Sequence, residues 1–165
     1  MSRIEFQQPV VHLPSIRRWG IDRVSLAYVL TKQLGLELIY PYGVHNFYYY
    51  TNVDGVAKML PYIIQKSELY SQDVFTCINF SFEVWNIVAK KFKVNTWLPV
   101  IGSIPGFDVK HAWNLVVVGD ETGLRPELFN YFEPNDGWDM GIELENAYQA
   151  FPIGEEGYVG ELVFQ

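Results

Sequence analysis

Cys77 is the only cysteine in the chain, and its position suits covalent chemistry. A cysteine nucleophile needs a lowered thiol pKa, a base within hydrogen-bonding reach and a group that orients this base. The apolar pattern predicts a helix from about residue 76 to 92, with Thr76 as its N-cap, or Asp73 if the helix begins earlier. Cys77 then falls in the first turn, where the helix dipole favours the thiolate.

His111 is the candidate base, since it opens an apolar strand-like run at residues 112 to 118. A chain that leaves the helix and runs one strand can return His111 to the helix start. If the following hairpin turns near Thr122, Glu133 lies roughly opposite His111 and can accept its ring N–H. A wider loop gives that place to Asn135 or Asp136 instead.

Predicted strands and one buried helix position these residues. Strand-like runs cover residues 96 to 101, 112 to 118 and 128 to 132, and the last two flank a polar loop, which predicts an antiparallel hairpin. The helix at 76 to 92 carries two apolar stripes, so we expect it to be buried and central. A short helix at 144 to 150 and a strand at 158 to 164 complete the chain.

The N-terminal part predicts a helix from 22 to 34, capped by Asp22 and stopped by Gly35. A tyrosine-rich segment at 40 to 50 suits a loop or an irregular edge strand, with at least one tyrosine ring at the surface. A second helix is expected at 55 to 69, with Pro61 as a kink or as its start. The expected apolar face of the first helix consists of Val24, Ala27, Leu30 and Leu34.

Composition limits the class of protein. The 165 residues fit one domain, and 49% of them are hydrophobic, which excludes global disorder. A net charge of −7 without a basic stripe argues against nucleic acid as a partner. No apolar run approaches the roughly 18 residues that a membrane helix needs, so we expect a cytoplasmic protein that does not bind membranes.

Metal and cofactor chemistry find little support in the sequence. Asp136 and Asp139 have no second histidine near them, and neither His12 nor His45 has another ligand at metal-binding spacing. The glycines near residue 102 lack the pattern of a nucleotide loop. We therefore expect no metal and no cofactor.

Three short stretches resemble the transglutaminase-like superfamily, whose members share the fold of papain-like cysteine enzymes. In that family a cysteine at a helix start, a histidine at an HAW-type strand start and an acidic residue at a strand end form a triad. The matching stretches are TCINF at 76–80, HAWN at 111–114 and FEPN at 132–135. The resemblance covers about residues 70 to 140, under half of the chain.

The resemblance implies that Cys77 is the nucleophile, His111 the base and Glu133 the third member of the triad. Two features depart from the family pattern: a glutamate replaces the usual aspartate, and Ile78 replaces the tryptophan that often follows the cysteine. For the oxyanion, the backbone N–H of Cys77 is the natural first donor. By similarity to papain-like enzymes, Gln72 is the candidate side-chain donor.

The resulting expectation is a single α+β domain of papain-like and transglutaminase-like fold, with a cysteine-bearing central helix packed on an antiparallel sheet that carries the histidine and the acidic residue. Residues 1–69 form a helical and aromatic-loop portion, 70–140 the transglutaminase-like core, and 141–165 a C-terminal helix and strand. Trp113 and Trp138 are expected as core or cleft-wall aromatics.

Two functions fit this sequence. The first is a cysteine-dependent hydrolase or acyltransferase, such as a cysteine protease or amidase, that acts on a peptide, a protein or another amide-containing ligand. The alternative is a non-catalytic module of the same fold that binds a peptide or a carbohydrate through its many aromatic residues. Association of identical copies through exposed aromatic residues is compatible with either function.

Overall fold

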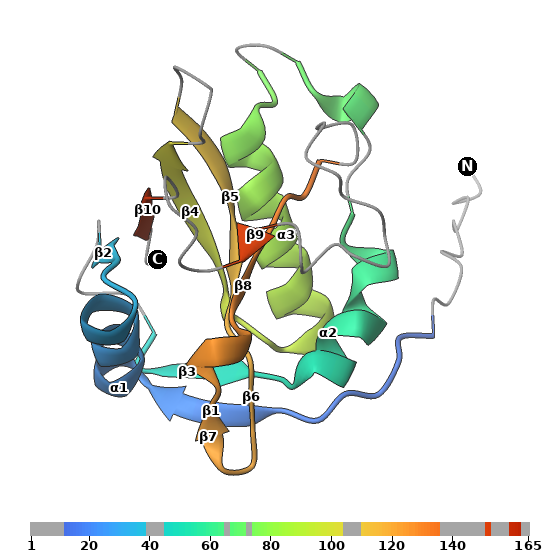
Figure 1. Cartoon of the computed structure of the whole chain (residues 1–165). Coiled ribbons are helices and arrows are strands. Elements are labelled where there is room, and N and C mark those ends of the chain that lie inside the picture. The colour runs from blue at the N-terminus through green and yellow to red at the C-terminus, as the bar shows by residue number, and fades with distance from the viewer. Residues whose placement is uncertain are drawn as a thin grey trace.

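The computed structural model describes residues 12–38, 45–64, 67–71, 74–103, 110–135, 151–152 and 159–162. Within them, six strands form one sheet in the order β2-β10-β4-β5-β8-β9 (Figure 1). Each neighbouring pair is antiparallel except β2 with β10, which is parallel. The strands are β2 (Glu37–Leu38), β4 (Trp97–Ser103), β5 (Lys110–Val116), β8 (Asn130–Phe132), β9 (Phe151–Pro152) and β10 (Val159–Leu162). The expected helix at 144 to 150 lies outside the described residues.

Helix α3 (Cys77–Phe92) packs against β4 and β5, so the architecture is a helix on an antiparallel sheet, as the sequence predicted (Figure 1). Phe80, Val84 and Val88 are fully buried on the face of α3 that meets the sheet. The expectation that both apolar stripes are buried was wrong. Ile78, on the stripe of residues 78, 82, 85, 89 and 92, is 44% exposed, although Phe92 at the other end of this stripe is buried.

The start of α3 is fixed by a capping box between Thr76 and Asn79. The Thr76 backbone N–H donates to Asn79 Oδ1 at 2.9 Å. At the other end Lys93 adopts the left-handed conformation, and its backbone N–H donates to the Ala89 carbonyl at 3.2 Å. The predicted boundaries of this helix were therefore correct.

The first predicted helix is α1 (Arg23–Tyr28) continued by a π-helical segment, η1 (Val29–Gln33). Asp22 caps it by accepting the Ser25 N–H at 2.9 Å, and Gly35, with φ +68°, ends it, as expected. The expected apolar face was partly wrong. Val24 is 73% exposed, whereas Leu26, one turn before the buried Leu30, is fully buried.

The tyrosine-rich segment contributes β3 (Phe47–Tyr50), which pairs antiparallel with β1 (Trp19–Asp22). Its side chains alternate between the surface and the core, and Tyr49 is 47% exposed, so the prediction of an exposed tyrosine ring was correct. The expected helix at 55 to 69 was too long. The α-helix α2 (Val53–Met59) ends in a 3-10 turn, η2 (Leu60–Tyr62), because Pro61 cannot donate an N–H.

A small hairpin and one helical turn lie between β5 and β8: β6 (Gly119–Asp120), β7 (Gly123–Leu124) and η4 (Pro126–Leu128). The hairpin turns at Thr122, whose N–H donates to Asp120 Oδ1 at 2.8 Å. Its register pairs Gly119 with Leu124, whereas β5 and β8 pair Asn114 with Phe132. The η4 turn thus adds residues between the hairpin and β8, so the register of the β6–β7 pair does not continue into the β5–β8 pair.

One apolar core joins α1, α2, α3 and the sheet. Trp97, Trp113, Tyr48, Tyr131, Phe80 and Phe132 are among its largest fully buried side chains. None of the helices in the described parts of the chain combines the length and the apolar character that crossing a bilayer requires.

Candidate active site

Cys77 is the first residue of α3 and is partly exposed to solvent. The capping box between Thr76, which precedes Cys77, and Asn79, which follows it by two residues, fixes the start of the helix. At this end of the helix, backbone N–H groups have no partner within the helix and point outward. The thiol therefore lies at the positive end of the helix dipole and remains accessible to solvent.

His111 lies on β5, opposite Gly102 of β4, and is only 4% exposed. Its imidazole stacks on the Trp113 ring, with the ring centroids 5.9 Å apart and the planes at 23°. Trp113 is itself 1% exposed and packs edge-on against Tyr131 at 5.6 Å. Trp113 therefore supports the imidazole from within the core and fixes the plane of the His111 ring.

Glu133 follows β8 directly and is buried. One carboxylate oxygen, Oε2, hydrogen-bonds His111 Nε2, and the other, Oε1, accepts the Asn135 backbone N–H at 3.0 Å. Because both oxygens have fixed partners, the carboxylate is held in one orientation toward the ring. This leaves Nδ1 as the imidazole nitrogen that faces the thiol of Cys77, which hydrogen-bonds the same ring.

The sequence allowed three partners for His111, namely Glu133, Asn135 or Asp136, and the strand register alone does not select the one that is observed. The β5–β8 ladder pairs Asn114 with Phe132, so its continuation sets Asn135, not Glu133, opposite His111. Glu133 nevertheless makes the contact, by a diagonal reach between neighbouring positions of the two chains. Diagonal neighbours are about 7–8 Å apart at the backbone, so the longer side chain of glutamate suits this geometry.

Several residues named from the sequence lie elsewhere or cannot be placed. Asn135 is 8% exposed and contributes its backbone N–H to Glu133. Gln72, Asp136 and Trp138 lie outside the described residues. Within the described ranges, no group of three or more histidine, cysteine, aspartate and glutamate side chains could hold a metal ion.

The electrostatics favour an ionised pair. Burial raises the pKa of the Cys77 thiol, but hydrogen bonds from His111 and from the Ala112 N–H, together with the charge of His111, outweigh this and lower it. Burial also lowers the pKa of His111, but its bonds to Cys77 and Glu133 and their charges raise it to about 9. Both shifts act in the same sense: they favour the thiolate form of Cys77 and the imidazolium form of His111.

Sequence reasoning missed two backbone N–H groups that lower the pKa of the Cys77 thiol, those of Ala112 and Ile78. The β5–β8 ladder ends at the pair Asn114–Phe132, so Ala112 lies beyond the last bonded pair of that ladder. Its backbone N–H instead donates to the sulfur of Cys77. Nothing in a side-chain pattern identifies a backbone donor, and only the point at which the strand pairing ends does so.

Comparisons with protein-family models, with curated proteins and with solved structures find no match to this chain. The site is thus defined by its own geometry: a partly exposed sulfur at a helix start, a buried imidazole and a buried carboxylate, linked in that order.

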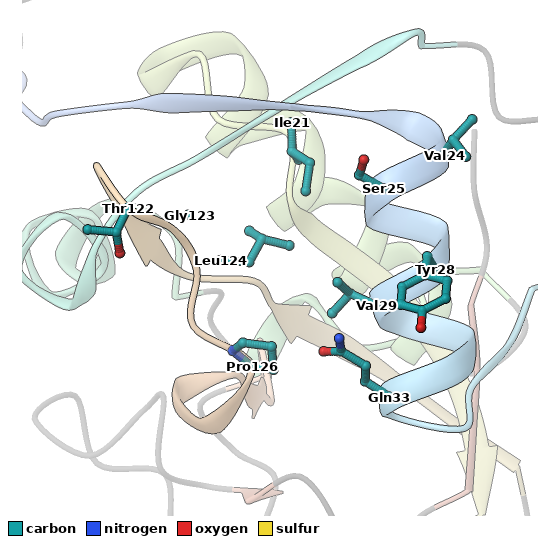
Figure 2. A pocket seen from close by; sticks show the side chains of 10 residues that line it. All are labelled: Ile21, Val24, Ser25, Tyr28, Val29, Gln33, Thr122, Gly123, Leu124 and Pro126. Carbon is teal, nitrogen blue, oxygen red and sulfur yellow. The ribbon is translucent and has the colours of Figure 1, made fainter.

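A separate groove of about 570 Å³ lies between the α1–η1 helix and the β6–β7 hairpin (Figure 2). Ile21, Val24 and Tyr28 line one side of it, and Leu124 and Pro126 line the other. None of its ten lining residues is charged, and none belongs to the Cys77 site. The groove is therefore no part of the candidate active site.

Proposed function

We propose that this protein is a cysteine-dependent acyl-transfer enzyme of papain-like and transglutaminase-like architecture that cleaves an amide or peptide bond. The observation that carries the proposal is the chain of contacts from the Cys77 thiol through the His111 imidazole to the Glu133 carboxylate. The three groups have the order that nucleophile, proton carrier and orienting group need. Their motifs also follow the family's order along the chain.

In the first step the Cys77 thiolate attacks the carbonyl carbon of the substrate and forms a C–S bond. Because His111 has a raised pKa, it carries the proton that the departing amine requires. The C–N bond breaks as Nδ1 gives this proton to the nitrogen, which leaves a thioester on Cys77. Glu133 holds the ring so that Nδ1 faces the sulfur throughout.

In the second step water attacks the thioester carbonyl and gives a proton to the now neutral His111. The C–S bond breaks, the carboxylic acid leaves, and the thiolate–imidazolium pair is restored. An amine in place of water yields a new amide instead. The backbone N–H of Cys77, at the helix start, is the group we assign to the oxyanion in both steps.

The test measures thiol reactivity first and turnover second. Alkylation of Cys77 by iodoacetamide at neutral pH, followed by mass spectrometry, should exceed that of free cysteine and should fall in His111→Ala. Incubation with a peptide mixture should then yield cleaved or amine-linked products in the wild type and none in Cys77→Ala. Alkylation no faster than free cysteine, unchanged by His111→Ala, contradicts the proposal.

The non-catalytic alternative predicts a different set of results. Peptide or carbohydrate binding would survive Cys77→Ala undiminished, and the wild type would show no turnover. The partial exposure of the sulfur together with the lowered pKa of the thiol supports the enzyme over this alternative, because a binding module has no need of an ionised thiol.

A further inference from the structure

Helix α3 and strand β5, which carry the nucleophile and the base, are joined by buried polar contacts below the active site. Ser81, on α3, donates from its hydroxyl to the Trp113 carbonyl at 2.8 Å. Asn114, on β5, donates from Nδ2 to the Ser81 carbonyl at 3.0 Å and to the Trp97 carbonyl at 3.1 Å. Both side chains are fully buried.

The positions of these two residues relate them directly to the catalytic candidates. Ser81 is one turn after Cys77, so the two share a face of α3. Asn114 is three residues after His111 on β5, and the Trp113 whose carbonyl Ser81 binds also stacks beneath the His111 ring. The contacts thus connect the turn below the sulfur to the strand segment beside the imidazole.

Apolar packing alone leaves a helix some freedom to slide along a sheet, because dispersion contacts have little directionality. Hydrogen bonds restrict that freedom, since they weaken steeply with misalignment. Here two bonds join α3 to β5, one in each direction, and a third bond, from Asn114 to the Trp97 carbonyl, holds the Asn114 side chain against β4. Both Asn114 acceptors are carbonyls, which determines the orientation of its amide.

We infer that Ser81 and Asn114 are positioning residues, which set the spacing between the Cys77 thiol and the His111 imidazole. The inference rests on the proposed function for its catalytic meaning. Its physical content, control of the ionisation of Cys77 and His111, can be measured without any substrate.

Ser81→Ala is the primary variant, because it removes one hydroxyl and keeps a good helix former. Asn114→Val is the second variant and suits a strand position. Thr96→Val is the matched control: Thr96 is also fully buried, and its hydroxyl bonds the carbonyls of Tyr49 and Val117, at 3.1 and 3.4 Å, neither of which belongs to α3 or to the site. All three variants lose buried hydrogen bonds, so a general loss of stability affects them alike.

The readout is the pH dependence of Cys77 alkylation, together with the NMR titration of the His111 ring. In Ser81→Ala and Asn114→Val the alkylation profile should move to higher pH and the pKa of His111 should fall toward its ordinary value. A rise of about one in the thiol pKa means roughly tenfold slower alkylation at a pH below it. Thr96→Val should keep the wild-type profile.

The outcomes separate the positioning role from the proposed function. Wild-type profiles in both Ser81→Ala and Asn114→Val overturn the inference, as does an equal change in Thr96→Val. If Asn114→Val fails to fold, Ser81→Ala alone decides. Suppose instead that the wild-type protein turns over no substrate while Ser81→Ala still shifts the alkylation profile of Cys77 and the titration of His111. That result sustains the positioning role and refutes the enzymatic proposal.

Discussion

Replacing Glu133 with glutamine tests the electrostatic logic of the site most directly. Glutamine keeps nearly the same shape but removes the negative charge that hydrogen-bonds His111 Nε2. The carboxylate is buried, so water screens this charge little. The substitution should therefore lower the pKa of the imidazole and leave the fold in place.

The size of the effect follows from the raised pKa of His111. Its rise from 6.5 to about 9 corresponds to roughly 3 kcal/mol in favour of the imidazolium, shared between the thiolate of Cys77 and the carboxylate of Glu133. Burial acts in the opposite direction, so the two partners together supply more than this net rise, and loss of the Glu133 charge should lower the pKa of His111 well below 9. The Cys77 thiol then loses part of its cationic partner, and its own pKa rises.

The assay is an NMR titration of the His111 ring alongside the rate of iodoacetamide alkylation against pH. Glu133→Gln should show a lower imidazole pKa and an alkylation curve displaced to higher pH, with about tenfold slower alkylation near neutrality. Glu121→Gln, which removes an exposed carboxylate elsewhere, is the control and should match the wild type. An unchanged His111 titration in Glu133→Gln would refute the assignment of Glu133 as the imidazole's partner.

Three further outcomes are expected. The raised His111 pKa contributes stability that is present below pH about 6.5 and lost as the pH rises through about 9, so in chemical denaturation Cys77→Ala should lose about 1.4 kcal/mol for each pH unit above 6.5 until the remaining His111 pKa is reached. The lowered Cys77 pKa contributes stability that is present above its unfolded value of 9.0 and lost as the pH falls through the folded pKa of the thiol, so the wild type should lose less stability over the same pH range. Gly35→Ala should cost about 1 kcal/mol in thermal unfolding, because a side chain at φ +68° is strained although nothing obstructs it, and Gly35→Asn should cost less. Asn79→Ala removes the capping partner of Thr76 and should cost about 1 kcal/mol and slow the alkylation of Cys77, and a variant of normal stability and reactivity would contradict the role given to the capping box.

The sequence predicted most of what local chemistry determines. The helix that begins at Cys77, the Asp22 cap, the Gly35 stop and the antiparallel pairing of β5 with β8 each depend on a few neighbouring residues, and all were correct. The residues of the candidate triad could be named for the same reason. A cysteine at a helix start and a histidine at a strand start are local features.

Tertiary packing decided the features that the sequence left open or misjudged. Val24 and Ile78 fit an apolar helical stripe, yet both side chains are exposed, and periodicity alone does not tell which of two apolar faces meets the sheet. The η4 turn shifts the strand register so that Asn135 falls opposite His111, and the contact of Glu133 with His111 depends on the diagonal reach of a longer side chain, which the sequence does not reveal. No local sequence pattern predicts the contact of the Ala112 amide with Cys77 or the Ser81–Asn114 contacts, because each of them links segments that are distant along the chain.

The η4 turn has a consequence for how this chain tolerates changes in length. It lies on a surface connection, where insertions and deletions are normally accepted at little cost. Here the connection leads directly into the strand that ends at Glu133, and a strand displaced by one residue turns every side chain to its opposite face. Removing a single residue from residues 125 to 129 should therefore separate the Glu133 carboxylate from His111. The same deletion at the β6–β7 turn should disturb this contact less, because η4 lies between that turn and β8.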